Sequence, residues 1–121
     1  MPERRPLIAG NWKMYKTGPE AADAARALKS LVAGVAGVDT MIAPTFTALA
    51  QVNAEIQGSN IGLGAQNMHW APEGAYTGEI SAGMLRACGC SYVILGHSER
   101  RQYFGETDQN VNRKLRAAIQ G

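Results

Sequence analysis

The chain turns from apolar to charged within one short stretch, Tyr92-Val93-Ile94-Leu95-Gly96-His97-Ser98-Glu99-Arg100-Arg101. The apolar run Tyr92–Leu95 is typical of a buried strand, and the polar residues follow where that strand ends and a loop or helix begins. In α/β proteins, functional side chains gather at the carboxyl ends of parallel strands. A neutral imidazole at a helix N-terminus can donate a hydrogen bond to an oxyanion, because the helix dipole disfavours its protonated form. His97 is therefore a candidate functional residue, although a solvated loop histidine fits this stretch equally well when it is taken alone.

Three further strands are predicted upstream, at Leu7–Asn11, Thr40–Ala43 and Ile61–Ala65. A helix follows the first of them, and Thr17-Gly18-Pro19-Glu20 predicts a capping box with proline in the first turn. Its apolar residues recur at helical spacing. The predicted inward positions are Ala21, Ala24, Ala25, Leu28, Leu31, Val32 and Val35.

Helices are predicted after the other strands as well. Thr45 or Thr47 can cap a helix that carries Leu49, Val52 and Ile56 and ends before Gly58, and Ser81 can cap a short helix that ends at Gly89. A last helix is predicted from about Asp108 to Gln120, and its inward residues are expected to be Val111, Leu115, Ala118 and Ile119.

Alternating strands and helices predict a parallel sheet with right-handed crossovers. Four such units fill the 121 residues, whereas a closed eight-stranded barrel needs eight units in about 250 residues. The expected fold is therefore α/β: a single domain, residues 1–121, of four consecutive βα units that form half of a (β/α)8 barrel. Because buried parallel strands with bare edges pair with something, we expect a chain that associates rather than a self-sufficient monomer.

Composition excludes several classes of protein. The net charge of +2 is too small to indicate nucleic-acid binding, and no apolar run reaches the length of a membrane span. The first ten residues lack the apolar stretch of a signal peptide. Cys88 and Cys90 have no further Cys and no nearby His pair to complete a metal set, so we expect reduced, mostly buried thiols in a cytoplasmic protein.

Five blocks of this sequence closely resemble the triosephosphate isomerase family, in order and with similar gaps. They are Gly10–Met14, Ala43-Pro44, Gly64–Asn67, Gly74–Ser81 and Leu95–Arg101, and the likeness runs from about Leu7 to Gly121. The resemblance implies a cytoplasmic TIM-barrel homodimer that interconverts dihydroxyacetone phosphate and D-glyceraldehyde 3-phosphate in glycolysis and gluconeogenesis. It implies no cofactor and no metal.

The same resemblance assigns catalytic and binding roles to residues of two blocks, Gly10–Met14 and Leu95–Arg101. Asn11 and Lys13 look like the substrate-binding pair, and the Lys13 ammonium would also offset charge that develops on an enediolate during catalysis. His97 looks like the catalytic electrophile that polarises the substrate carbonyl, an assignment known for this enzyme family. Glu99 and Ser98 resemble residues that support the lysine and the histidine.

The long loop Met68–Gly78 resembles the family loop that reaches into the other subunit. Thr77 would approach the partner's site beside Tyr76, Glu79 would pair with the partner's Arg100, and Met14 would lie in the same contact. A solvated surface loop is the alternative interpretation. His69, on this loop, is interpreted as a packing or surface residue rather than as a ligand.

One family feature has no counterpart in these residues. The catalytic glutamate lies in a later stretch, written in the family roughly as Tyr-Glu-Pro-Val-Trp, and no such stretch occurs here. We therefore expect the 121-residue chain to be inactive alone. Two hypotheses follow: the N-terminal half of a functional isomerase, or a non-catalytic half-barrel that pairs with itself or with a separate C-terminal half. An isomerase acting on another sugar phosphate is a weaker third hypothesis.

Overall fold

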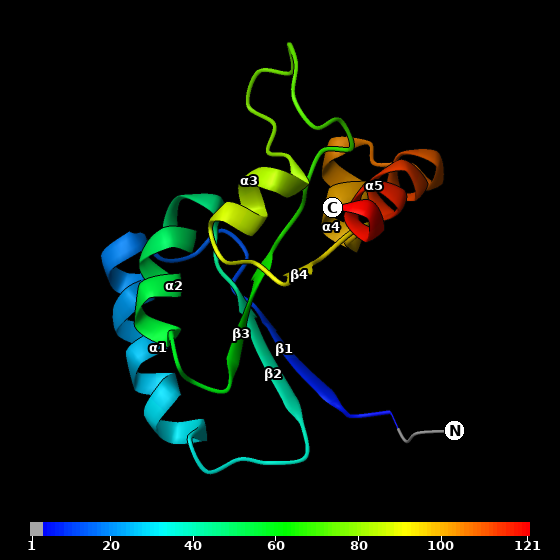
Figure 1. Cartoon of the computed structure of the whole chain (residues 1–121). Helices are drawn as coiled ribbons and strands as arrows, with labels where there is room; N and C mark the ends of the chain where they lie inside the picture. Colours follow the sequence, from blue (N-terminus) through cyan, green and yellow to red (C-terminus); the bar gives the residue numbers. More distant parts are fainter. Residues whose placement is uncertain (1–3) are drawn as a thin grey trace.

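A computed structural model describes residues 4–121, and its centre is a four-stranded parallel sheet in the order β1-β2-β3-β4 (Figure 1). The strands are β1 (Leu7–Asn11), β2 (Asp39–Ala43), β3 (Ile61–Ala65) and β4 (Tyr92–Val93). The helices are α1 (Gly18–Val32), the 3-10 turn η1 (Phe46–Ala48), α2 (Leu49–Ile56), α3 (Ala82–Ala87), α4 (Ser98–Phe104) and α5 (Asp108–Gln120). The predicted α/β class with parallel strands is confirmed. Residues 1–3 of the expected domain, which are also the first residues of the stretch compared with a signal peptide, lie outside the described residues.

The strand register brings all four carboxyl ends to one edge of the sheet. Asn11 on β1 pairs with Ala43 on β2, and Ala65 on β3 pairs with Val93 on β4. Because every connection returns the chain to the same starting edge, the loops that follow the strands lie together. The residues after each strand are therefore neighbours in space although they are far apart in sequence.

Helices α1 and α2 lie side by side on one face of the sheet (Figure 1). Their small and aliphatic side chains form one core with alternate residues of β2 and β3. The buried members of this core are Ala21, Ala25, Ile42, Ala48, Leu49, Val52, Ile56, Ile61, Leu63, Ala65, Met68 and Leu85. No helix in residues 4–121 has both the length and the apolar character to cross a membrane.

Glycines line the opposite face of β3, and large side chains of the neighbouring strands cover them. A Cβ at Gly62 would lie 2.7 Å from a ring carbon of Tyr92, and one at Gly64 would lie 2.8 Å from the terminal methyl carbon of Met41. Met41 is 4% exposed in consequence. Side chains of β2 and β4 thus partly cover the second face of the sheet at β3.

Two of the predicted helix caps are confirmed. In α1, the Thr17 hydroxyl accepts a hydrogen bond from the Glu20 N–H, and the Glu20 carboxylate accepts one from the Thr17 N–H at 3.0 Å. The Thr17 N–H also holds the pKa of Glu20 below its usual value. In α3, Ser81 Oγ accepts from the Met84 N–H at 3.3 Å.

The predicted cap on the second helix is wrong. Neither Thr45 nor Thr47 bonds a free N–H of the helix, because their hydroxyls bond each other at 2.9 Å. The 3-10 turn η1 leads into α2 instead, and such turns are common at helix ends.

The end of the fourth strand also differs from the prediction. Strand β4 pairs only through Tyr92 and Val93, although the Ile94 N–H still donates to the Ala65 carbonyl at 2.8 Å. The predicted run Tyr92–Leu95 is half-buried rather than buried, because β4 has a neighbour on one side only. A separate helix, α4, begins directly after His97, so of the two possibilities at the end of this strand, a loop or a helix, the structure has the helix.

Two helices expose apolar residues that were predicted to face inward. In α5, Leu115 is 49% and Ile119 is 77% exposed, whereas Val111 and Ala118 are half-buried. Lys114 is buried instead, because Glu106 and Asn67 accept its hydrogen bonds.

The last turn of α1 shows the same deviation. Leu31 is 80% exposed, and Val35 beyond the helix is 45% exposed. The core contacts of α1 come from the buried Ala21 and Ala25 and from the half-buried Leu28 and Val32. The helical spacing predicted the helix correctly but overestimated how wide a face of its last turn is covered.

Cys88 and Cys90 are free but half-buried, so the prediction of mostly buried thiols is corrected. Burial raises the pKa of Cys90 to about 11. A thiol with such a high pKa is mostly protonated at neutral pH, and therefore a weak nucleophile.

Two leucines on neighbouring helices test this distribution of buried surface. Leu49→Ala should lower the free energy of unfolding by about 2–5 kcal/mol, because Leu49 is 2% exposed and its loss leaves a cavity. Leu31→Ala removes the same atoms from an 80% exposed site and should change the free energy of unfolding by less than about 0.5 kcal/mol. Urea unfolding of both variants measures the difference. Equal losses would show that the end of α1 is covered in solution.

Candidate functional site

His97 lies between the end of β4 and the first turn of α4, and its imidazole caps that helix. Its Nδ1 accepts a hydrogen bond from the Glu99 N–H at 3.0 Å. In a neutral imidazole an accepting Nδ1 leaves the proton on Nε2. The side chain is 28% exposed. His97 is thus held as a donor whose Nε2–H is available to an external oxygen.

Lys13 and Glu99 form an ion pair beside this histidine. Lys13 Nζ lies 2.8 Å from Glu99 Oε2, and Glu99 Oε1 lies 3.6 Å from His97 Nδ1. The hydrogen bond from Lys13 holds the pKa of Glu99 below its usual value, and the same bond raises the pKa of Lys13. Both side chains therefore stay charged at neutral pH.

Asn11 and Gln66 hold the backbone at Lys13. The Lys13 N–H donates to Asn11 Oδ1 at 3.0 Å, and Gln66 Nε2 donates to the Lys13 carbonyl at 2.9 Å. Lys13 has φ +52°, in the left-handed region that few residues other than glycine adopt. Sequence reasoning did not select Gln66, because an amide after a strand has no chemical signature of its own. Ser98 is exposed and makes no side-chain hydrogen bond within residues 4–121.

A buried polar network lies behind these residues, and it too was missed. Lys114 Nζ bonds Glu106 Oε1, and it donates to Asn67 Oδ1 at 2.9 Å. Arg100 Nε lies 3.6 Å from Glu106 Oε2, and neither atom has a hydrogen bond partner in the described part of the chain. The network joins the segment after β3, the first turn of α4, the connection between α4 and α5, and the middle of α5. A lysine within an amphipathic helix normally indicates solvent, so the sequence offered no sign that Lys114 is buried.

The loop that carries Tyr76 projects from the body of the molecule above α3 (Figure 1). It is braced internally, because the His69 N–H donates to the Ile80 carbonyl at 2.8 Å and the His69 ring lies 4.4 Å from the Tyr76 ring. His69 is buried, with Nδ1 3.8 Å from Glu79 Oε1. Tyr76 is 48% exposed, and Thr77 is exposed at the turn.

Further apolar side chains are exposed near the Lys13–Glu99 ion pair. Met14, next to Lys13, is 92% exposed, and Tyr15 is 69% exposed. Helix α4, which carries Glu99, also presents Tyr103 and Phe104, each 69% exposed. Of these four residues, only Met14 was predicted at the subunit contact. The resemblance assigned no role to Tyr15, Tyr103 or Phe104.

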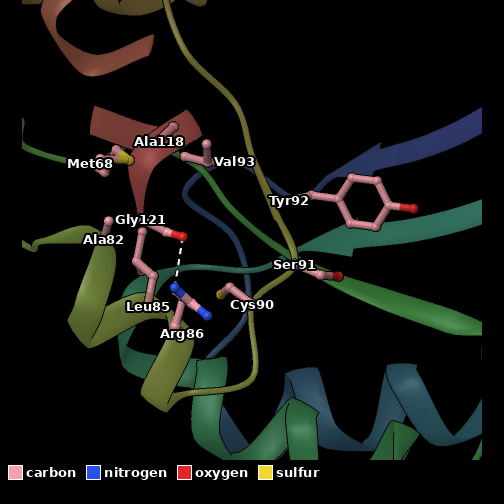
Figure 2. A pocket seen from close by; sticks show the side chains of 10 residues that line it. All are labelled: Met68, Ala82, Leu85, Arg86, Cys90, Ser91, Tyr92, Val93, Ala118 and Gly121. Atoms are coloured by element: carbon pink, nitrogen blue, oxygen red, sulfur yellow. Dashed lines mark hydrogen bonds between the residues drawn. The ribbon is translucent and has the colours of Figure 1, made fainter. Parts of the chain in front are cut away.

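A cavity of about 410 Å³ lies apart from this cluster, between α3, β4 and α5 (Figure 2). Its walls are largely apolar and include Leu85, Val93 and Ala118. The one charged side chain in it, Arg86, donates to the Gly121 carbonyl at 2.7 Å. None of the residues around His97 lines this cavity, and its walls carry no catalytic constellation.

Metal binding receives no support from the arrangement of side chains. Across residues 4–121, no three His, Cys, Asp or Glu side chains are grouped so that they could hold a metal ion. The polar groups that gather at this edge of the sheet are the His97 imidazole, the Lys13 ammonium and the Asn11 amide.

Comparison with known proteins places this geometry in a family. The family model for triosephosphate isomerase matches residues 6–121. A triosephosphate isomerase of Endomicrobium trichonymphae is 60% identical over 116 residues, which are 96% of this chain and 46% of that protein. One of Pelobacter propionicus is 58% identical over the same coverage. The chain thus spans about half the length of the curated relatives it matches.

A solved structure agrees with the sequence relatives. The crystal structure of triosephosphate isomerase from Bartonella henselae superposes with a TM-score of 0.90 at 43% identity, over 97% of this chain and 48% of that one. The four parallel strands with their helices therefore correspond to half of that protein's barrel, as the count of βα units predicted. The chain belongs to the triosephosphate isomerase family.

Proposed function

We propose that these residues supply the carbonyl-polarising half of a triosephosphate isomerase site, which interconverts dihydroxyacetone phosphate and D-glyceraldehyde 3-phosphate without a cofactor. The observation that carries the proposal is the convergence of His97, Lys13 and Asn11 at the carboxyl edge of the sheet. The hydrogen bond that Glu99 N–H donates to His97 Nδ1 connects this arrangement to a defined chemistry.

The reaction moves a proton between two neighbouring carbons, so an oxyanion develops on the substrate. A donor aimed at that oxygen stabilises the transition state more than the ground state. The His97 Nε2–H is such a donor, because Nδ1 is already engaged by the Glu99 N–H. The Lys13 ammonium adds positive charge, and its raised pKa keeps it cationic.

Abstraction of the carbon-bound proton needs a base, and Glu99 is a poor one. Its Oε2 accepts the Lys13 hydrogen bond at 2.8 Å, and that bond lowers the pKa of Glu99. A general base works best when its pKa lies near the working pH. Glu99 therefore supports Lys13 and His97, and the base belongs to the part of the family's site that these residues do not resemble.

The exposed apolar residues favour a homodimer as the working form. Met14 and Tyr15 adjoin Lys13, and the Lys13–Glu99 ion pair places their loop against α4, which carries Tyr103 and Phe104. Exposed apolar and aromatic clusters of this kind mark protein interfaces. In the proposed dimer Tyr76 and Thr77 reach the partner's site, and Glu79 and Arg100 pair between subunits. We assign the dimer to the cytoplasm, the compartment of glycolysis and gluconeogenesis.

The 121-residue chain alone should show no isomerase turnover above background, because it holds the electrophile without a base. A coupled assay of glyceraldehyde 3-phosphate consumption measures this. Turnover within about a hundredfold of a typical enzyme's roughly 10 s⁻¹ would contradict the assignment of the base to residues outside this chain.

Fusion of residues 1–121 to the remainder of the Endomicrobium trichonymphae relative should give an active isomerase. In this fusion His97→Gln should lower kcat by about 10²–10⁴-fold, the usual contribution of a positioned acid or base, with a much smaller change in KM. Leu31→Ala is the control, because Leu31 is 80% exposed near the end of α1 and touches none of the site residues, and it should leave kcat within about tenfold. A change confined to KM would make His97 a binding residue only.

Sedimentation at micromolar concentration tests the association. The unmodified chain should sediment as a dimer or larger species, and both Thr77→Arg at the loop tip and Ile8→Lys on the open edge of β1 should shift it towards monomer. Leu31→Arg places a charge on an exposed apolar residue of α1, which is 80% exposed against 60% for Ile8 and lies on neither proposed contact, and should have no effect. A compact monomer of the unmodified chain would refute the proposal.

A further inference from the structure

Gln66 follows β3, and its side chain reaches the ends of two other strands. Its Nε2 donates to the Ala43 carbonyl at 2.8 Å and to the Lys13 carbonyl at 2.9 Å. An amide nitrogen has two protons, so both are used. Two carbonyl acceptors at these distances also identify the nitrogen, and not the oxygen, as the atom that faces them.

These two bonds continue the sheet beyond the point where strand pairing stops. The Trp12 N–H donates to the Ala43 carbonyl at 3.1 Å, which is the last main-chain bond between β1 and β2. Lys13, the next residue, has left the ladder, and its carbonyl accepts from Gln66. Since β3 is not a neighbour of β1, only a side chain that crosses the end of β2 can make this connection.

The residue that Gln66 holds has an unfavourable backbone conformation. Lys13 has φ +52°, and a side chain with a Cβ keeps such a conformation only where its surroundings enforce it. Inside the loop, the Asn11 side chain supports it by accepting from the Lys13 N–H. Gln66 is the support from outside the loop, because it is fixed to β3.

The backbone conformation at Lys13 determines where its ammonium lies. With φ positive, Nζ reaches Glu99 on α4 at 2.8 Å. Rotation to negative φ would redirect Cβ and carry the ammonium away from Glu99 and His97. The position of the charge therefore depends on whatever stabilises the backbone.

We propose that Gln66 is a positioning residue, which fixes Lys13 in its left-handed conformation and thereby sets the Lys13 ammonium against Glu99. The importance of Gln66 for catalysis rests on the proposed function, in which Lys13 is the cation that faces the substrate. The conformational claim itself concerns contacts within residues 11–99 and is measurable without substrate.

Nuclear magnetic resonance of the labelled 121-residue chain provides the test. In the unmodified chain, the Lys13 Cα and Cβ shifts should be those of a positive-φ residue. Titration should give a Lys13 pKa above, and a Glu99 pKa below, their ordinary values, because the two groups share a hydrogen bond. In Gln66→Met, the shifts should move to negative-φ values, and both pKa values should return towards ordinary ones.

Gln57→Met is the matched control. Gln57 is exposed at the other end of β3 and makes no side-chain hydrogen bond within the part of the chain that the structure describes. The Gln57→Met substitution should change neither the Lys13 chemical shifts nor the pKa of Lys13 or Glu99. If Gln66→Met lowers the midpoint of unfolding but leaves these signatures unchanged, Gln66 only ties the strands together and the proposal is wrong.

A second comparison keeps the proposal open to refutation if Gln66→Met unfolds. Glycine adopts positive φ without strain, so Gln66→Met should cost much less stability in a Lys13→Gly chain than in the unmodified one. An equal loss, or unfolding in both backgrounds, would overturn the proposal. Because neither experiment involves turnover, failure of the isomerase proposal would leave both results interpretable.

Discussion

Parallel pairing of four consecutive strands is the constraint on which the rest of this structure depends. It places Asn11, Ala43 and Ala65 at one edge although they lie on three different strands, far apart in the sequence. Each residue that follows a strand end then meets its counterparts from the other strands. The Lys13–Glu99 ion pair, 86 residues apart in sequence, is a product of this topology and not of any local motif.

Two groups of Glu99, its backbone N–H and its carboxylate, make separate hydrogen bonds at that edge. The backbone N–H of Glu99 orients His97, while the Glu99 carboxylate holds Lys13. One residue thus sets the direction of a neutral donor and the position of a cation. The arrangement suits stabilisation of an oxyanion, and the Lys13 hydrogen bond to Oε2 lowers the pKa of Glu99, which makes Glu99 a weak base.

The sequence predicted the local structure where a short-range physical signal existed. Alternation of apolar runs and helical periods located β1 and β3, and the Thr17–Glu20 pair located the start of α1. His97 and Lys13 were identifiable because their blocks resemble a known family, and the structure places both at the carboxyl edge of the sheet.

The remaining features depend on contacts that no local pattern encodes. Lys114 is buried only because Glu106 and Asn67 converge on it from other loops, and Gln66 matters only because β1 and β2 end beside it. Likewise, Leu115 and Ile119 are exposed because no neighbouring element in the described residues covers them on α5. Helical spacing alone does not reveal which neighbours cover a helix. Tertiary context decides burial even where periodicity decides the element.

The central claim is that the half-barrel alone holds His97 as an outward-facing donor. Long-range proton–nitrogen correlation of its imidazole in the 121-residue chain, at a pH where the ring is neutral, reports which nitrogen carries the proton. The account predicts a single tautomer with the proton on Nε2, because Nδ1 accepts the Glu99 N–H. A proton on Nδ1, or signals averaged between the two tautomers, would contradict it.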